Sequence, residues 1–225
     1  MDILEYLAIA IPRLAEGLLI TFKVSSICLG IGVLVGIPTA IARVYGPRWM
    51  RWIVTGFIEI IRGTPVLVQL FLVYYGLPQF GLTFSAFTSA YIAIGMNSGA
   101  YQAEYFRGAI QAIRSGQMMA ARSIGMTRMQ AIRHIILPQA LRLAIPAWSN
   151  EAVSMIKISS IVYLIAVPDM LYTAKDLMAK YYNPFQTYIT VGVIYLIVIG
   201  AISLMLNGLE KRLTIPGMEL DKRGA

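Results

Sequence analysis

The 225-residue chain is 58% hydrophobic and only 13% charged, with a mean hydropathy of +0.69. Soluble domains carry about 25% charged residues, so the composition excludes an ordinary soluble domain and indicates a membrane protein. The formal net charge of +8 points to nucleic acid only if the positions of the charges have no other explanation.

The hydropathy pattern predicts an all-α, polytopic membrane protein forming a single domain over residues 1–225. A helix needs about 20 residues to cross the hydrocarbon. Residues 1–14 are expected to form a short helix on the outer surface. Helices 1–3 follow within 15–108, a connecting loop over 109–138, helices 4–5 within 139–208, and a tail at 209–225. The five expected spans are 15–42, 53–75, 85–107, 139–165 and 187–208.

Basic residues divide unevenly between the two sets of connecting segments. The segments after the first, third and fifth spans, together with the span ends at Arg107 and Arg142, contain 13 Lys and Arg residues, against 3 on the other side. Cytoplasmic loops collect Lys and Arg, so we expect the N-terminus outside and the C-terminus, with the loop 109–138, in the cytoplasm. This topology accounts for the positive charge, and we expect no nucleic-acid partner.

The second span contains a predicted break at residues 62–65. Glycine and proline disfavour helix, and Pro65 also restricts the residue before it. Glu59 and Arg62 lie three residues apart and are expected to pair on one helix face. In the first and third spans, glycines four residues apart predict close packing between helices; these are Gly32, Gly36, Gly95 and Gly99.

Polar side chains recur in the third and fourth spans, at depths where hydrocarbon is expected. A polar face cannot meet lipid without a large free-energy cost. We therefore expect Asn97 and Ser98 of the third span and Glu151 and Ser154 of the fourth to line a small substrate cavity. The alternative is a structural ion pair that Glu151 and Lys157 form between helices.

The loop 109–138 is too regular in pattern to be a flexible linker. Met118, Met119 and Ile124, with neighbouring alanines, predict an apolar patch on a short helix. Gly125 is expected to end that helix in a left-handed conformation. Small alanines at the centre of the helix suit docking into a groove of a partner protein.

The motifs of an enzyme or an ATP-driven motor are missing. No lysine follows a glycine, which excludes the phosphate loop that ends in Gly-Lys-Ser/Thr. His134 is the only histidine, which excludes a multi-histidine metal site and a serine activated by a buried histidine. We expect no catalytic residue, no metal and no cofactor on this chain.

The loop resembles the coupling motif of ATP-binding-cassette (ABC) importer permeases, E-A-A-x3-G-x9-I-x-L-P. Six of the seven fixed positions agree, and Met119 stands where the motif has Glu; the matching residues are Ala120, Ala121, Gly125, Ile135, Leu137 and Pro138. Other stretches are similar to the polar amino acid branch of these permeases: IRGTPVLVQLFLVYYGLP (61–78), YQAEYFRGAIQAI (101–113), LPQALRLAIPAWSNE (137–151) and KISS (157–160).

The resemblance implies a five-helix subunit of the type I importer fold in the cytoplasmic (inner) membrane of a prokaryote. It implies a second permease subunit, identical or related, and two ATPase subunits that bind the ATP and Mg²⁺. It also implies an extracellular or periplasmic binding protein that delivers an amino acid. Residues 115–126 would be the coupling helix in the ATPase cleft, through Gly116, Met119, Ala120, Ala121 and Gly125.

The resulting hypothesis is ATP-driven import of polar amino acids. Glu151 is available to a cationic group, which favours arginine, lysine or histidine as the substrate. The alternative is a membrane scaffold or regulatory subunit that has the permease fold without carrying a substrate. Charged and amide side chains in mid-membrane favour transport, because a scaffold does not need them.

Overall fold

The computed structural model describes residues 3–213, so residues 1–2 and 214–225 lie outside the description. All regular structure in residues 3–213 is helical, which confirms the all-α prediction. The long helices are α1 (Ile3–Tyr45), α2 (Arg48–Gly63), α4 (Ala86–Ala112), α7 (Leu137–Ile158) and α9 (Pro184–Leu213). The short ones are α3 (Val66–Phe71), α5 (Ser115–Ser123), α6 (Arg128–Ala131) and α8 (Met170–Tyr181), with π-helical turns at Leu72–Gly76 and Ile132–Ile136 and 3₁₀ helices at Leu77–Phe80 and Ser159–Ile165.

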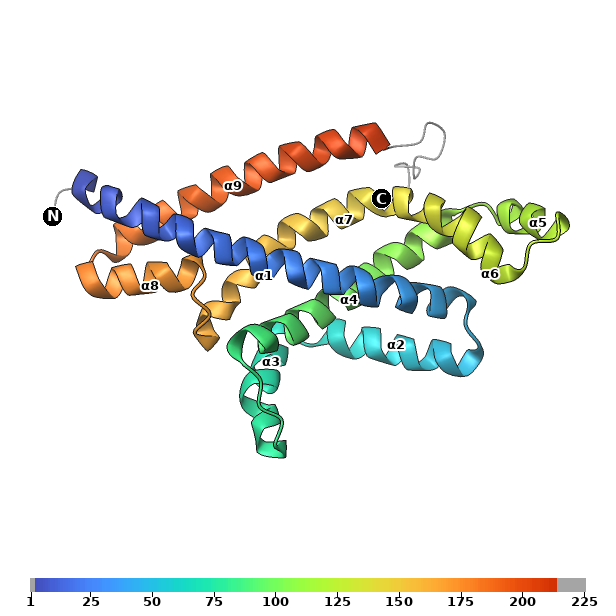
Figure 1. Ribbon diagram of the computed structural model, residues 1–225, viewed down its shortest axis with the longest axis horizontal. Coiled ribbons are helices and arrows are strands. Elements are labelled where there is room, and N and C mark those ends of the chain that lie inside the picture. The colour runs from blue at the N-terminus through green and yellow to red at the C-terminus, as the bar shows by residue number, and fades with distance from the viewer. Residues whose placement is uncertain (1–2, 214–225) are drawn as a thin grey trace.

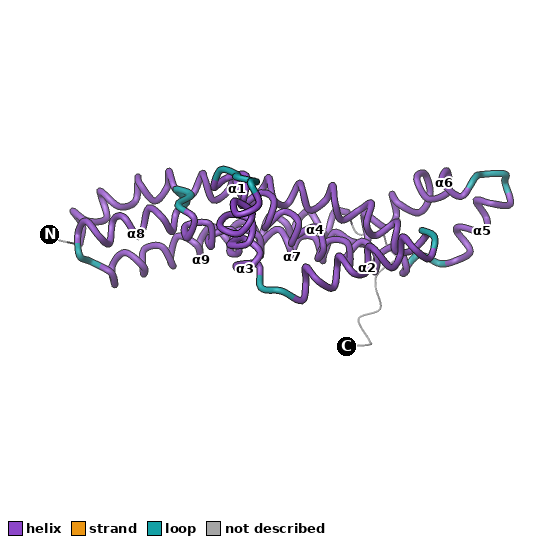
Figure 2. The backbone as a smooth tube through the Cα atoms, turned by 90° about the horizontal axis from the view of Figure 1, so that it is seen from below, coloured by secondary structure: helices purple, strands orange, loops and turns teal. Residues whose placement is uncertain are grey.

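The long helices form an elongated bundle with different structures at its two ends. The first turns of α1, helix α8 and the start of α9 lie together at one end, and α5 and α6 form the tip of the other (Figures 1 and 2). We call these the α8 end and the α5 end. Helix α1 runs the length of the bundle, with α4 packed along it (Figure 1).

Small residues allow α1 and α4 to approach closely. A Cβ atom added to Gly99 would lie 2.9 Å from Val35 Cβ, and one added to Gly36 would lie 2.9 Å from Gln102 Cβ. Each helix thus presents glycines to side chains of the other, as the spacing of the glycines predicted. The predicted close packing is confirmed.

The number of membrane crossings is not fixed by the helices alone. Within residues 3–213, α1 and α9 are each long and apolar enough to cross a membrane. Two bent helix pairs, Arg48–Gly63 with Val66–Phe80 and Arg128–Ile165 with Met170–Tyr181, raise the number to four if each is one span. The helical membrane fold agrees with the sequence analysis, while the count of five stays a prediction.

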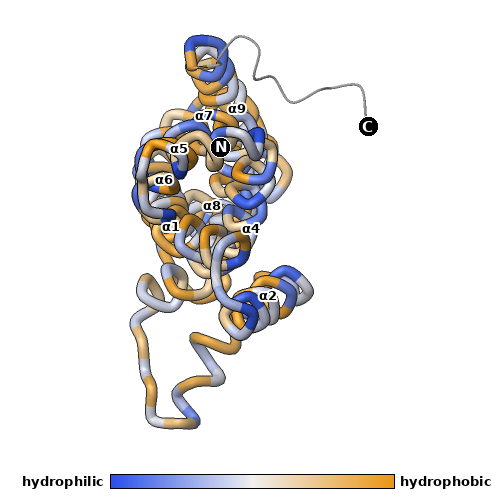
Figure 3. The backbone as a smooth tube through the Cα atoms, turned by 90° about the vertical axis from the view of Figure 1, so that its right-hand side faces the viewer, coloured by the Kyte–Doolittle hydropathy of each residue, from blue (hydrophilic) through white to orange (hydrophobic). Residues whose placement is uncertain are grey.

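The segment expected as one span over 53–75 is two helices. Helix α2 ends at Gly63, and the next helix is bent from it by 102°. Thr64 has the extended conformation (φ −116°, ψ 142°) that a following proline imposes. The predicted break is therefore confirmed, while the crossing of the membrane by this segment as one span stays a prediction. Helix α3 points away from the bundle (Figure 1), and α2 lies beside the other helices (Figure 3).

The separate surface helix expected over 1–14 is absent from the described residues, because α1 is continuous from Ile3 to Tyr45. Tyr6, Ala10 and Leu14 are fully buried and pack in one cluster with Met170 and Leu177 of α8. These contacts hold the first turns of α1 against protein, in line with the rest of the helix. Of the expected tail, 209–213 belong to α9 and 214–225 lie outside the described residues.

Candidate functional site

A polar cavity of about 480 Å³ lies where the α2–α3 break faces α4 and α7. Three of the four residues predicted to line a substrate cavity do line it: Asn97, Glu151 and Ser154. The remaining lining residues are Arg62, Gly63, Thr64, Pro65, Val66, Tyr101, Tyr105 and Ile158. The cavity therefore contains side chains of both charges, in a part of the chain that is otherwise apolar.

Ser98 was predicted to line the cavity and does not. Its side chain is fully buried, and its hydroxyl donates a hydrogen bond of 2.9 Å to Oε1 of Glu151. The reason is helical geometry: neighbouring residues of a helix point about 100° apart. Asn97 thus faces the cavity, whereas Ser98 faces the Glu151 carboxylate and lies outside the cavity lining. Ser98 is a positioning residue for the carboxylate.

Glu151 is held from two sides by α4. Besides Ser98, the hydroxyl of Tyr105 donates to Oε2 of Glu151 at 3.3 Å. The Ser98 hydroxyl in turn accepts a hydrogen bond of 3.0 Å from Gln102 Nε2. Glu151 is only 6% exposed, so these donors fix the direction in which its carboxylate faces the cavity.

Polar groups at the α2–α3 break satisfy the backbone of the cavity wall. The last carbonyl groups of a helix have no partner within the helix and need one in a membrane. Thr64 Oγ1 donates to the Ile60 carbonyl at 2.9 Å, and Gln69 Nε2 donates to the Ile61 carbonyl at 2.6 Å. Asn97 Nδ2 donates to Gln69 Oε1 at 3.1 Å, which joins the break to α4.

Three residues that line the cavity had no predicted site role: Arg62, Tyr101 and Tyr105. The guanidinium carbon of Arg62 lies 5.0 Å from the centre of the Tyr101 ring. Both tyrosines belong to the polar face of α4 that predicted the cavity, so their position was available from helical spacing. Arg62 differs, because it lies on α2, and its position beside α4 and α7 depends on how these helices pack.

A cluster of ion pairs adjoins the cavity on its α5 side. Glu104 accepts hydrogen bonds from Arg43 of α1 and from Nε and Nη2 of Arg107, the latter two at 3.1–3.2 and 2.8 Å. Arg62 Nη1 lies 4.0 Å from Glu104 Oε2. The predicted pairing of Glu59 with Arg62 is not seen: the described ion pair of Glu59 is with Arg43, at 3.8 Å. Glu104 thus links α1, α2 and α4.

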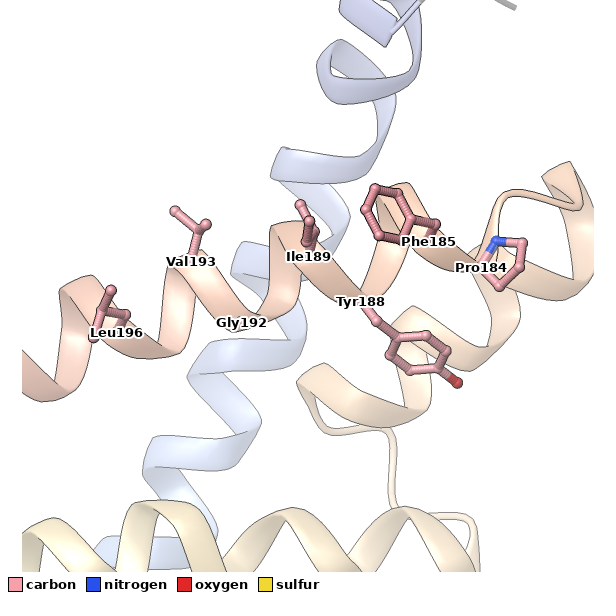
Figure 4. A pocket seen from close by; sticks show the side chains of 7 residues that line it. All are labelled: Pro184, Phe185, Tyr188, Ile189, Gly192, Val193 and Leu196. Carbon is pink, nitrogen blue, oxygen red and sulfur yellow. The ribbon is translucent and has the colours of Figure 1, made fainter.

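A larger hollow, of about 630 Å³, carries no such chemistry. All of its lining residues come from the first half of α9, and they form one apolar face (Figure 4). The residues are Pro184, Phe185, Tyr188, Ile189, Gly192, Val193 and Leu196. A face of this composition suits contact with lipid or another apolar helix, and it offers no charged group to a polar ligand.

The loop expected over 109–138 is a helical hairpin at the α5 end of the bundle (Figure 1). Helix α4 continues to Ala112, α5 spans Ser115–Ser123, and Thr127 and Gln130 cap the start of α6 reciprocally. The hairpin is anchored to α1 because Arg128 stacks over the Tyr45 ring at 5.2 Å. This contact joins the start of α6 to the last residue of α1.

Gly125 ends α5 as predicted. It has a φ of +90°, its N–H donates to the Arg122 carbonyl, and the N–H of Met126 donates to the Ala121 carbonyl. This is the hydrogen-bond pattern of a helix closed by a left-handed glycine. A residue with a Cβ atom is strained in that conformation.

The residues assigned to partner docking point in two directions. Gly116 and Ala120 are exposed, Met119 is 63% exposed and Ile124 is 79% exposed. Ala121, in contrast, is only 4% exposed, because it faces inward from α5. A direct contact of Ala121 with a partner, as the sequence analysis assigned it, is therefore wrong for this structure.

No group of three or more His, Cys, Asp or Glu side chains in residues 3–213 is arranged to hold a metal ion. The site consists of one carboxylate, one guanidinium, amide and hydroxyl groups, and tyrosine rings. Such a set offers hydrogen-bond donors, hydrogen-bond acceptors and charge to a polar ligand.

Comparison with known proteins adds the family. Residues 32–215 match the family described as the binding-protein-dependent transport system inner membrane component. The chain belongs to this family. As a member it is a membrane permease, whereas ATP hydrolysis belongs to a separate chain. Permeases of this type work with ATPase and substrate-binding protein partners.

Individual relatives of the permease are similar over nearly their whole length. The glutamine transport system permease protein GlnP of Escherichia coli is 36% identical over 92% of this chain and 95% of its own. The L-cystine transport system permease protein TcyB of Bacillus subtilis is 36% identical over 90% of this chain and 87% of its own. A solved amino acid ABC transporter, crystallised with histidines, matches with 39% identity and a TM-score of 0.86, over 94% of this permease and 99% of that chain.

Proposed function

We propose that the chain is the translocation subunit of an ABC importer for polar amino acids, with a preference for basic ones. It pairs with a second permease subunit, identical or related, and with two ATPase subunits. An extracellular binding protein delivers the amino acid. Relatives named for glutamine and cystine support amino acids as the substrate class.

The observation that carries this proposal is the position of Glu151 in a polar cavity between helices. A buried carboxylate in a membrane is costly unless it is paired or hydrated. The donors to Glu151 are neutral hydroxyl groups, from Ser98 and Tyr105. No cation among the described residues pairs with this carboxyl group, so its oxygens are open to a cationic group of a ligand.

Lys157 does not supply that cation in the described structure. It lies at an exposed position, and the ion pairs of the described residues join other side chains. The structural pairing of Glu151 with Lys157 therefore has no support. A lysine, arginine or histidine substrate would bring its cationic group to Glu151.

The hairpin of α5 and α6 is the proposed contact with the ATPase. Its exposed Met119, Ala120 and Ile124 would enter a groove of the ATPase, while Gly116 and Gly125 bound the helix. The excess of basic residues on this side supports a cytoplasmic location of the α5 end, with the N-terminus outside. Closure of the ATPase would then move the hairpin and, through Tyr45 and Arg128, the inner end of α1.

Reconstitution tests the proposal. The permease is placed in liposomes with its ATPase and binding protein, and ATP-driven uptake of each of the twenty amino acids is measured. We expect uptake of arginine, lysine or histidine, and a loss of at least about tenfold in Glu151→Gln, which keeps the size and removes the charge. Glu59→Gln makes the same change on a side chain that is 68% exposed and is expected to leave uptake unchanged.

Two outcomes would contradict the proposal in different ways. ATP hydrolysis without uptake of any amino acid would favour the scaffold alternative. Uptake of neutral amino acids alone, unaffected by Glu151→Gln, would leave the importer in place and remove the preference for basic substrates.

A further inference from the structure

The cavity contains a second charged group, the guanidinium of Arg62, which its neighbours leave available to a ligand. Arg62 lines the cavity from the end of α2, facing the helices that carry Glu151 and its donors. We propose that Arg62 binds the α-carboxylate of the transported amino acid. This inference rests on the proposed function, since it assigns one part of the substrate to one side of the same cavity.

The ion pairs around Glu104 leave Arg62 the least neutralised of three guanidinium groups. Arg107 donates to the Glu104 carboxylate at 2.8–3.2 Å, and Arg43 also donates to it. Arg62 reaches the same carboxylate only at 4.0 Å, the outer limit of an ion pair. Its side chain is 38% exposed, against 29% for Arg107 and 21% for Arg43.

The charges of the cluster do not balance. The described ion pairs join three arginines to two carboxylates, Glu104 and Glu59, so one positive charge is in excess. Glu104 is 15% exposed and already accepts from two arginines. The excess therefore falls on Arg62, at the edge of the cluster that opens into the cavity.

The Tyr101 ring lies next to the Arg62 guanidinium. The guanidinium carbon lies 5.0 Å from the ring centre, within the range in which a cation is attracted to an aromatic face. A guanidinium group is planar and presents a rigid set of N–H donors, which fits the two oxygens of a carboxylate. A lysine ammonium would supply the charge without this geometry.

The two charged groups of the cavity match the two charges that every α-amino acid carries. Glu151, held by Ser98 and Tyr105, takes an ammonium or a cationic side chain, and Arg62 takes the carboxylate. A ligand without a free carboxylate would leave Arg62 with only its long ion pair to Glu104. The cavity is thus expected to discriminate against amines and α-carboxamides of the same shape.

The test combines substitutions in the protein with changes to the carboxylate of the ligand. The complex of permease and ATPase is placed in lipid nanodiscs without binding protein. Binding of L-arginine, L-histidine and L-glutamine, and of the α-carboxamide of each, is measured by calorimetry to wild type, Arg62→Gln and Arg62→Lys. Arg107→Gln is the matched control, because it also removes a partner of Glu104 but does not line the cavity.

We expect wild type to bind at least one of the three amino acids about 10- to 100-fold more tightly than its carboxamide, the range for one charge-assisted contact. Arg62→Gln should weaken binding of the amino acid but not of its carboxamide, which brings the ratio of the two affinities close to one. Arg62→Lys should keep part of the wild-type preference for the amino acid. Arg107→Gln should keep the wild-type ratio.

Each other outcome decides against the inference. An unchanged ratio in Arg62→Gln, or equal weakening of acid and carboxamide, means that another group binds the carboxylate, while the proposed function stands. If the wild-type protein binds an amino acid no more tightly than its α-carboxamide, Arg62 likewise does not bind the carboxylate. If wild type binds none of the three amino acids, the cavity is not a substrate site, and the cavity role in the proposed function fails as well. Melting temperatures of all variants show whether a loss reflects unfolding.

Discussion

Ser98 donates a hydrogen bond of 2.9 Å to Glu151, across the contact between α4 and α7. The serine is fully buried and outside the cavity lining, so its effect on a ligand passes through the carboxylate that it orients. This separates a positioning role from direct contact with the substrate, and it can be measured.

Ser98→Ala is expected to weaken amino acid binding about tenfold, equivalent to about 1.4 kcal/mol, because one hydrogen bond to a charged group is lost. Ser89→Ala is the control: Ser89 is also fully buried in α4, and its hydroxyl has no hydrogen-bond partner among the described residues. Calorimetry on the purified complex measures both. Equal effects of the two substitutions would show that Ser98 acts only through packing.

Glu104→Gln is expected to destabilise the permease strongly, by about 3 kcal/mol, since it leaves arginines of three helices without their shared carboxylate. Glu59→Gln should change stability by less than about 0.5 kcal/mol, because Glu59 is exposed and its ion pair is long. Thermal unfolding in detergent compares the two. A melting temperature of Glu104→Gln that equals that of Glu59→Gln would mean that the cluster contributes little to stability.

Gly36→Ala is expected to destabilise by about 1–3 kcal/mol, the usual range for overpacking. The new methyl group would lie 2.9 Å from Gln102 Cβ and 3.1 Å from the backbone nitrogen of Ala103. Gly30→Ala places the same methyl group in the same helix with no atom within 4 Å, so it should not destabilise. Chemical denaturation in mixed micelles tests the pair, and a similar loss for both would contradict close packing as the reason for Gly36.

Ala120→Trp is expected to reduce association with the ATPase at least about tenfold, because Ala120 is exposed on α5 and a groove shaped for alanine has no room for an indole. Leu209→Trp adds an indole at another exposed position, 45% exposed and near the end of α9, and should associate normally. The measurement is the amount of ATPase that co-purifies from membranes with each permease variant, relative to wild type. Normal association of Ala120→Trp, with normal membrane insertion, would speak against docking through α5.

Ala121→Trp addresses a different question, because the structure buries Ala121. The large side chain is expected to disrupt the fold of the hairpin itself. Limited proteolysis between α4 and α7 should therefore increase in Ala121→Trp and stay at the wild-type rate in Ala120→Trp. Equal protection of both variants would contradict the inward position of Ala121.

The sequence predicted the features that depend on local pattern. Depth and polarity identified Asn97, Glu151 and Ser154, glycine spacing identified the contact of α1 with α4, and Gly125 identified the end of α5. It did not predict the separate roles of Asn97 and Ser98, because adjacent polar residues look alike until the partner helix is placed. Arg62 was paired with its neighbour Glu59, since the sequence cannot show that Glu104, far along the chain, comes closer.

The bend after α2 illustrates the same limit. Gly63 and Pro65 predict that the helix stops, but the direction of the next helix depends on tertiary contacts. The 102° angle places the residues of the break, Thr64, Pro65 and Val66, in the cavity wall. Had the segment continued straight, the cavity would lose one of its walls.

The unbroken course of α1 has a mechanical consequence. At about 1.5 Å per residue, a helix from Ile3 to Tyr45 is roughly 64 Å long and acts as a single beam. Its prolines, Pro12 and Pro38, lie toward its two ends, where bending is easiest, so the stretch between them is stiff. A tilt of the stretch between Pro12 and Pro38 therefore carries that whole stretch as one rigid body across most of the bundle, and any bending is confined to the two prolines.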